Sequence, residues 1–82
     1  MKKTILDVIH ENGYVKIKYG YKKVTEKTTH WITVFEEDKI QMYGYETDDL
    51  ELVSIYNTGI IFISPVNLQS FIDVFNSNYK YD

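Results

Sequence analysis

The sequence predicts a single α+β domain, with a five-stranded, mainly antiparallel sheet flanked by a short N-terminal helix and a longer C-terminal helix. Three observations lead to this fold class: apolar residues recur at helical spacing near each end, five alternating or apolar runs lie between, and the connections are short. Short connections favour antiparallel neighbours, so we expect a meander in the order α-β-β-β-β-β-α. The chain of 82 residues is predicted to be one domain, residues 1–82.

Both predicted helices have recognisable ends. In residues 3–11 the apolar side chains fall at helix-like offsets, Thr4 can cap the first turn, and Gly13 lies where helices commonly stop. Ser64 followed by Pro65 is a strong start for the second helix, because the hydroxyl caps it and proline lacks only an N–H that would be unpaired there. An apolar stripe then predicts packing on the sheet, through Leu68, Phe71, Ile72, Phe75 and Tyr79.

Alternation of apolar and polar residues defines the predicted strands. In the first strand we expect Val15, Ile17, Tyr19 and Tyr21 to face the core. The last strand is apolar at successive positions, which indicates a strand buried on both faces. The predicted strands cover residues 14–23, 29–37, 39–45, 50–57 and 59–64.

The tripeptide Tyr-Gly-Tyr occurs twice, at residues 19–21 and 43–45. In the first copy both tyrosines fall on the same face of the predicted strand as the preceding apolar residues. In the second copy Tyr43 and Tyr45 fall on the face opposite the preceding apolar residues, so the copies are not a duplicated element. A bulge at Gly44 would reverse this parity, and the sequence leaves that alternative open.

Composition excludes several classes of protein. The chain has no cysteine, so it forms neither disulfides nor thiolate metal sites, and no apolar run approaches the ~20 residues of a membrane span. We therefore expect a cytoplasmic protein with no membrane partner. Alanine and arginine are absent while lysine, isoleucine, asparagine and tyrosine are abundant, which is typical of AT-rich coding in a low-GC bacterium or its mobile elements. Missing arginine also makes sequence-specific recognition of duplex DNA less expected.

Charge is distributed unevenly along the chain. Residues 1–35 hold seven lysines and three acids, whereas residues 36–82 hold two lysines and nine acids. We expect the acids around the third strand to form a patch that binds a host protein with a basic surface, using two tyrosines as anchors. The alternative is that these acids only solvate turns. The predicted protein-binding residues are Glu36, Glu37, Asp38, Tyr43, Tyr45, Glu46, Asp48, Asp49 and Glu51.

A second hypothesis is that one sheet face binds single-stranded nucleic acid. If Ile32 and Val34 face the core, then Trp31 faces outward, and aromatic rings beside lysines would form a stacking platform. The alternative for these aromatics is that a helix covers them as part of the core. A third hypothesis is a homodimer joined through an edge strand or the aromatic face. The platform would consist of Tyr14, Lys16, Lys18, Trp31, Tyr43 and Tyr45.

No pattern in the sequence indicates catalysis. His10 and His30 have no second histidine at metal-ligand spacing, so we expect structural roles for both. The serines lack a nucleophile-elbow setting, and the four glycines are too scattered for a phosphate loop. Asp48, Asp49 and Glu51 lack the ligand pattern of a calcium loop. We therefore expect a protein that is not an enzyme and needs neither metal nor cofactor.

In size, acidity, tyrosine content and inferred AT-rich coding, the whole chain resembles the broad class of small phage-encoded or mobile-element proteins that block host enzymes, anti-CRISPR proteins among them. No motif is shared, so the resemblance carries over no residues. It implies an inhibitor or adaptor that acts on a host protein such as a defence nuclease. This is the leading hypothesis, with nucleic-acid binding and homodimerisation as alternatives.

Overall fold

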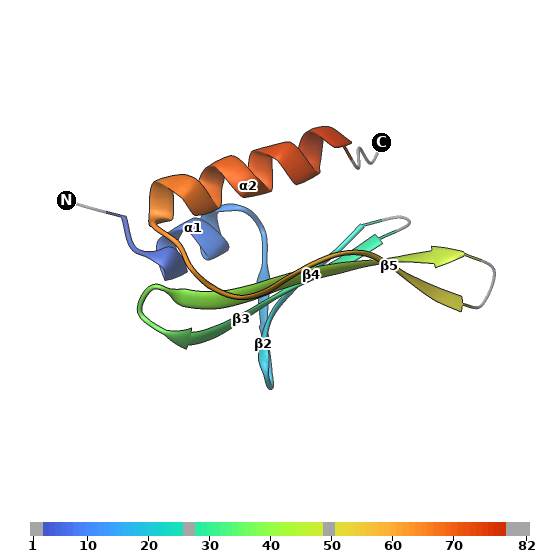
Figure 1. Cartoon of the computed structure of the whole chain (residues 1–82), viewed down its shortest axis with the longest axis horizontal. Coiled ribbons are helices and arrows are strands. Elements are labelled where there is room, and N and C mark those ends of the chain that lie inside the picture. Colours follow the sequence, from blue (N-terminus) through green and yellow to red (C-terminus); the bar gives the residue numbers. More distant parts are fainter. Residues whose placement is uncertain (1–2, 26–27, 49–50, 79–82) are drawn as a thin grey trace.

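Two helices and five strands follow the predicted order over residues 3–25, 28–48 and 51–78, the part of the chain that the computed structural model describes. These elements are α1 (Ile5–Glu11), β1 (Val15–Ile17), β2 (Gly20–Val24), β3 (Thr28–Glu36), β4 (Lys39–Asp48), β5 (Glu51–Phe62) and α2 (Pro65–Asn78). The strands pair as an antiparallel meander in the order β1-β2-β3-β4-β5. The predicted fold class is confirmed. Both helices lie on one face of the sheet (Figure 1).

Helix α1 begins at the predicted cap. The Thr4 hydroxyl accepts a hydrogen bond from the backbone N–H of Asp7 at 3.1 Å, and the Asp7 carboxylate accepts one from the N–H of Thr4 at 2.9 Å. This reciprocal capping box satisfies two N–H groups that the helix leaves unpaired. The helix ends at Asn12, and Gly13 follows with a φ of 83°, a conformation that glycine adopts without strain. On the sheet-facing side Ile9 is fully buried.

Helix α2 begins after Ser64, as the sequence predicts. The Ser64 hydroxyl accepts a hydrogen bond from the backbone N–H three residues further on, at 3.2 Å. Leu68 and Ile72 are buried against the sheet, as expected from the apolar stripe. Phe71 was predicted to lie with them but is 39% exposed, because it falls on the flank of the helix. Tyr79, the last residue of the predicted stripe, lies outside the described residues.

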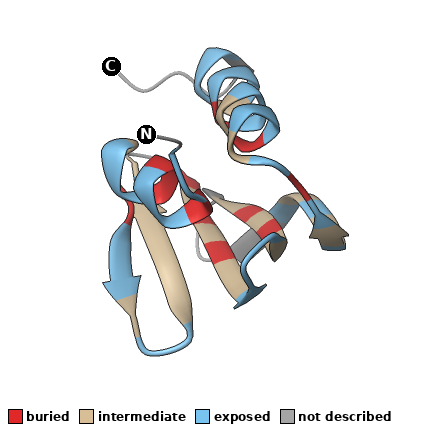
Figure 2. Ribbon diagram, turned by 90° about the vertical axis from the view of Figure 1, so that its left-hand side faces the viewer, coloured by how far each residue is buried: buried red, intermediate tan, exposed pale blue. Residues whose placement is uncertain are grey.

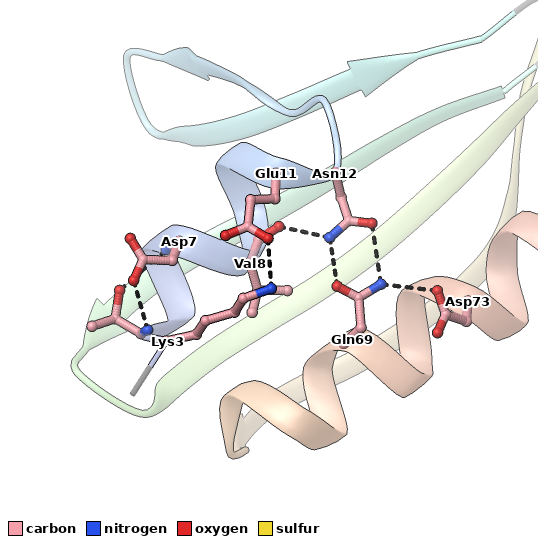
Figure 3. A network of polar contacts seen from close by, with 8 residues as sticks. Lys3, Asp7, Val8, Glu11, Asn12, Gln69 and Asp73 are labelled. Carbon is pink, nitrogen blue, oxygen red and sulfur yellow. Dashed lines mark hydrogen bonds and ion pairs between the residues drawn. The ribbon is translucent and has the colours of Figure 1, made fainter. Parts of the chain in front are cut away.

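A reciprocal pair of amides joins the two helices (Figure 3). Asn12 Nδ2 donates to Gln69 Oε1 at 2.9 Å, and Gln69 Nε2 donates to Asn12 Oδ1 at 3.2 Å. Each amide has a second acceptor on its own helix, the carbonyl of Val8 for Asn12 and the carboxylate of Asp73 for Gln69. These contacts fix which side of α2 faces α1.

The first predicted strand, residues 14–23, is instead a hairpin of two strands. Ile17 pairs with Gly20, so the chain reverses over the two residues between them. Gly20 has a φ of 153°, and a Cβ there would lie 2.6 Å from a carbonyl oxygen of β3, so no larger residue fits without a shift of the backbone. The prediction that Val15 and Tyr19 face the core is wrong: their side chains are 66% and 76% exposed. The turn removes Tyr19 from the strand and ends the alternation on which the prediction depended.

The last two predicted strands are one strand, β5. Relative to β4 it carries one extra residue at Ile55 and another at the step from Thr58 to Gly59, so two irregularities bend it without ending it. The prediction that this segment is buried on both faces is wrong, because Ile60 and Phe62 are 56% and 74% exposed. Both lie on the sheet face that the helices leave uncovered.

The hydrophobic core lies between the two helices and the sheet face beneath them (Figure 2). Among the described side chains no buried polar atom lacks a hydrogen bond. Neither described helix is long and apolar enough to cross a membrane. The largest fully buried side chains are Ile9, Ile32, Ile40, Met42, Leu68 and Ile72.

Candidate interaction face of the sheet

Strand β4 keeps its alternation through Gly44, which settles on which face its tyrosines lie. Ile40 and Met42 are buried under the helices, and the pairing of β4 with β3 is continuous through this stretch. The irregularity beside Gly44 places its extra residue on β5 and none on β4. Tyr43 and Tyr45 therefore lie on the face opposite the helices, as predicted, and the alternative of a reversed parity is excluded.

Three aromatic rings form a cluster on this uncovered face, which we call the aromatic triad: Trp31, Tyr43 and Tyr45. Trp31 of β3 pairs directly with Tyr43 of β4, and their rings are stacked with centroids 5.4 Å apart and an angle of 20° between planes. Tyr45 meets Trp31 edge-on at 5.3 Å. All three rings are half-buried by one another and by their neighbours. The alternative that a helix covers them is wrong, because both helices lie on the other face (Figure 1).

The triad sits within a larger apolar surface, the open face, which is the side of the sheet turned away from the helices. Its described charged side chains are Lys22, Lys39 and, at the end of β3, Glu36, which pairs with Lys39. Lys22 pairs with Trp31, and Lys39 Nζ lies 5.8 Å from the centre of the Phe62 ring. Monomeric proteins rarely leave so many large apolar side chains together in water. Those that are exposed here are Val15, Val24, Phe35, Ile60 and Phe62.

A shallow hollow of about 310 Å³ lies beside the triad, and two amides line part of it. Gln41 Nε2 donates to Asn57 Oδ1 at 3.0 Å, and the same oxygen accepts a hydrogen bond from the N–H of Gly59 at 2.9 Å. Within the described part of the chain, Gln41 Oε1 and Asn57 Nδ2 have no hydrogen-bond partner. The hollow therefore combines apolar walls with one acceptor and one donor. It is lined by Thr33, Phe35, Gln41, Tyr43, Tyr45 and Asn57.

Only half of the predicted stacking platform is assembled. Tyr14 is buried in the core at 6% exposure. Lys16 pairs with Tyr21, which pairs with a buried residue of β3, so Lys16 lies on the helix side of the sheet. Lys18 lies in the hairpin turn, with its Nζ 5.4 Å from the centre of the Tyr19 ring. The prediction that these three residues share the face of Trp31 is wrong, because the hairpin changes the register of the first strand.

Lys22 takes the place beside Trp31 that the sequence analysis gave to other lysines. Simple alternation through residues 14–23 places Lys16, Lys18 and Lys22 on one face of the strand. The sequence therefore offered no reason to prefer Lys22 to the other two as the lysine beside Trp31. Only the pairing across the hairpin separates them. A recognisable turn sequence at residues 18–20 would have revealed the hairpin, but Lys-Tyr-Gly is not among the sequences that strongly favour a hairpin turn.

The predicted acidic residues do not form one patch. Glu36 ends β3, and Glu37 and Asp38 form the turn before β4, whereas β4 ends at Asp48 and β5 begins at Glu51, at the far end of the strand (Figure 1). At about 3.3 Å per residue, a strand of this length separates the two groups by roughly 30 Å. Glu46 pairs with Thr28 on the helix side of the sheet, away from Tyr43 and Tyr45. Asp49 and the side chains of Asp48 and Glu51 lie outside the described residues.

On the helix side, His30 belongs to the packing of α2 against the sheet. Its Nε2 lies 2.9 Å from the Thr28 hydroxyl and its Nδ1 lies 2.7 Å from the Tyr56 hydroxyl. The ring also stacks with Phe75 of α2 at 6.4 Å. Burial, together with a smaller effect of the charge of Lys23, lowers the pKa of His30 from 6.5 to about 4. A neutral histidine held in this way has the structural role expected of it.

Among the described residues, the other histidine and the acids form no cluster with recognisable chemistry. His10 packs edge-on against Tyr21, with ring centres 5.7 Å apart. Within the described ranges no three histidine, aspartate or glutamate side chains lie close enough together to hold a metal ion. Comparisons with protein-family models, with curated proteins and with solved structures found no match to this chain. The open face and its residues are therefore the basis on which a function can be inferred.

Proposed function

We propose that this chain is a non-catalytic binding protein that docks on a partner protein through its open face, with the aromatic triad as the anchor. The observation that carries the proposal is the position of the triad on two inner strands of a sheet that no helix covers on that side. Tyrosine and tryptophan are the residues most enriched at the energetic centres of protein interfaces.

The chemistry around the triad supports a protein as the partner. Interface cores are poor in charge and rich in aromatic and large apolar side chains, and the open face has both properties. Its described charges are few, with Lys22 beside the triad and the pair of Lys39 and Glu36 at one end, so a neutral or weakly acidic partner surface would fit around the triad. The basic partner expected from the sequence would instead have to meet the turns at the ends of β4. An inhibitor or adaptor of a host enzyme remains the finer form of this proposal.

Single-stranded nucleic acid is the second candidate, and the specific observation in its favour is Lys22 beside Trp31, with no acidic residue paired to the triad. Base stacking needs an exposed ring face. Trp31 and Tyr43 already stack on one another, so each gives up one face within the protein. This arrangement favours contact through ring edges and hydroxyls, which suits a protein partner better than a row of bases.

The test compares two variants in affinity capture from a nuclease-treated lysate of a low-GC bacterial host. Tyr43→Ala combined with Tyr45→Ala removes two rings of the triad, whereas Tyr19→Ala removes a more exposed tyrosine from the hairpin turn, away from the triad. We expect the double variant to lose a captured protein that the Tyr19 variant retains, and to bind that purified protein at least tenfold more weakly. Equal binding by both variants, with the fold retained by circular dichroism, would overturn the proposal.

The sole tryptophan gives a direct measure of contact, because Trp31 lies within the triad. Addition of the purified partner should shift or quench its fluorescence. Titration with a single-stranded oligonucleotide at low salt tests the second candidate in the same cuvette. A strong, salt-sensitive quench by the oligonucleotide and none by protein would reverse the order of the two candidates.

A further inference from the structure

A second surface lies along one side of the molecule, where the open edge of β5 meets the flank of α2. It is poor in charge, with Asp38 at one end beside Phe62 and Asn67. The sheet order leaves one edge of β5 without a neighbouring strand. Above this edge α2 is anchored by Phe75, whose ring stacks on Tyr56 of β5 with centroids 4.0 Å apart. We call this surface the β5 side.

Helical geometry places two exposed apolar residues of α2 on the β5 side. Gln69 bonds to Asn12 and so marks the direction of α1, while the buried Leu68 marks the direction of the sheet. At 100° per residue, Phe71 and Val74 point away from α1. Because α1 contacts β2 and α2 contacts β5, a side chain of α2 that points away from α1 lies over the open edge of β5. Phe71 is 39% exposed and Val74 is 53% exposed.

The composition of the β5 side is unusual for a surface in water. Residues 54–62 of β5 contain no charged residue and no proline, whereas lysine and proline are the usual means of protecting an edge strand. From Pro65 to Ser77, α2 contains one charged residue, Asp73, which bonds to Gln69 on the α1 side. A solvent-facing helix normally carries charges along its outer stripe. Depletion of charge is typical of the core of an interface.

We propose that a second copy of this chain packs against the β5 side, so that the protein is a two-fold symmetric homodimer. A two-fold axis brings the same surface of each copy together, with the α2 helices antiparallel and the β5 edges side by side. The chain has a net charge of −3, and a side with few acids is where two copies can meet with the least repulsion between them.

The available area is sufficient for such a dimer. The shorter extents of the molecule are 24 and 19 Å, and residues 54–62 of β5 span roughly 30 Å at ~3.3 Å per residue, so the β5 side offers roughly 600–700 Å², toward the lower end of what one partner contributes to a stable interface. The irregularities of β5 limit regular backbone pairing to short stretches such as Ile60 to Phe62. The side chains of α2 therefore provide much of the contact.

This dimer is independent of the proposed docking function, because the open face lies on another side of the molecule (Figures 1 and 2). Each copy keeps its own aromatic triad available. The assembly would present two triads to a partner, which increases avidity when the partner also offers two sites.

Cysteine cross-linking tests the arrangement cleanly, because the chain contains no cysteine of its own. Asn67→Cys and Val74→Cys place a thiol on the β5 side, and Tyr19→Cys places one on the distant hairpin as a control. Under mild oxidation we expect at least one of the α2 variants to form a covalent dimer at least tenfold faster than the control. If neither α2 variant cross-links faster than Tyr19→Cys, the proposal is wrong.

Sedimentation over a concentration series of the wild-type chain supplies the second measurement. We expect a dimer, and we expect Val74→Lys and Phe71→Lys each to raise its dissociation constant at least tenfold while the fold is retained. A wild-type monomer at several hundred micromolar would overturn the inference and leave the docking proposal standing. Conversely, Tyr43→Ala with Tyr45→Ala should leave the dimer intact, so the two proposals fail separately.

Discussion

Replacement of Gly44 by alanine tests the packing beneath the aromatic triad. Gly44 is not in the left-handed region, so an alanine brings no backbone penalty there. Its Cβ would instead meet the Tyr56 ring, lying 2.9 Å from Cζ and closer still to Cε1. The ring is held by its hydrogen bond to His30 and by its stack on Phe75, so it cannot move away without loosening α2.

The expected cost follows from this geometry. Overpacking of a core by one methyl group typically costs ~1–3 kcal/mol, and loss of the Tyr56–His30 hydrogen bond would add about 1 kcal/mol. For a domain of this size, a loss of about 2 kcal/mol lowers the melting temperature by roughly 10 °C. Thermal and urea unfolding followed by circular dichroism measure both quantities.

A double-mutant cycle separates the clash from other causes. In a Tyr56→Val background no ring reaches residue 44, so Gly44→Ala should become neutral or slightly stabilising. Gly59→Ala serves as a control for backbone strain without a clash, since Gly59 has a φ of 68° and open space around its Cβ position. If Gly44→Ala costs the same with and without the Tyr56 ring, close approach of that ring is not the reason for the glycine.

Three further predictions concern the helix side of the molecule. The folded state favours the neutral form of His30, so the free energy of unfolding is highest above pH 6.5 and decreases as the pH falls toward 4. Urea titrations across this range should show a decrease in the free energy of unfolding of up to roughly 3 kcal/mol, which a His30→Asn variant does not show. Asn12→Ala and Gln69→Ala should each lower the free energy of unfolding, and their double-mutant cycle should give a coupling energy of about 1 kcal/mol. If the two effects are additive, the amide pair does not join the helices. Thr4→Ala removes the capping hydroxyl and should lower the free energy of unfolding by ~1 kcal/mol, whereas Thr4→Ser should restore most of it, and equal stability of all three would contradict the capping role.

Local signals in the sequence were sufficient for the helices and the fold class. A capping hydroxyl at Thr4 or Ser64 acts over three residues, and the buried pair Leu68 and Ile72 repeats at helical spacing, so both are visible without knowledge of the fold. The strands were harder to place. The hairpin turn before Gly20 lacks a strong turn sequence, and Gly59 resembles a turn although β5 continues through it.

In the candidate site, too, the sequence predicted some features and could not predict others. The parity of β4 followed from alternation alone, so the outward direction of Tyr43 and Tyr45 was predicted correctly. The lysine beside Trp31 depended on the register between strands, which the sequence did not supply. The acidic residues were grouped because they are close in sequence, but a strand of ten residues holds them at opposite ends.

The sequence by itself therefore determined the class of the domain, the ends of its helices and the two faces of its third predicted strand, because each depends on contacts within one turn or one pleat. Tertiary structure alone decided that both helices lie on the same face and that Gly44 accommodates Tyr56. It also decided that the uncharged stretch of β5, residues 54–62, lies beside the apolar flank of α2. These features depend on which surfaces meet when the chain packs its small core, and that choice is made by side chains far apart in the sequence.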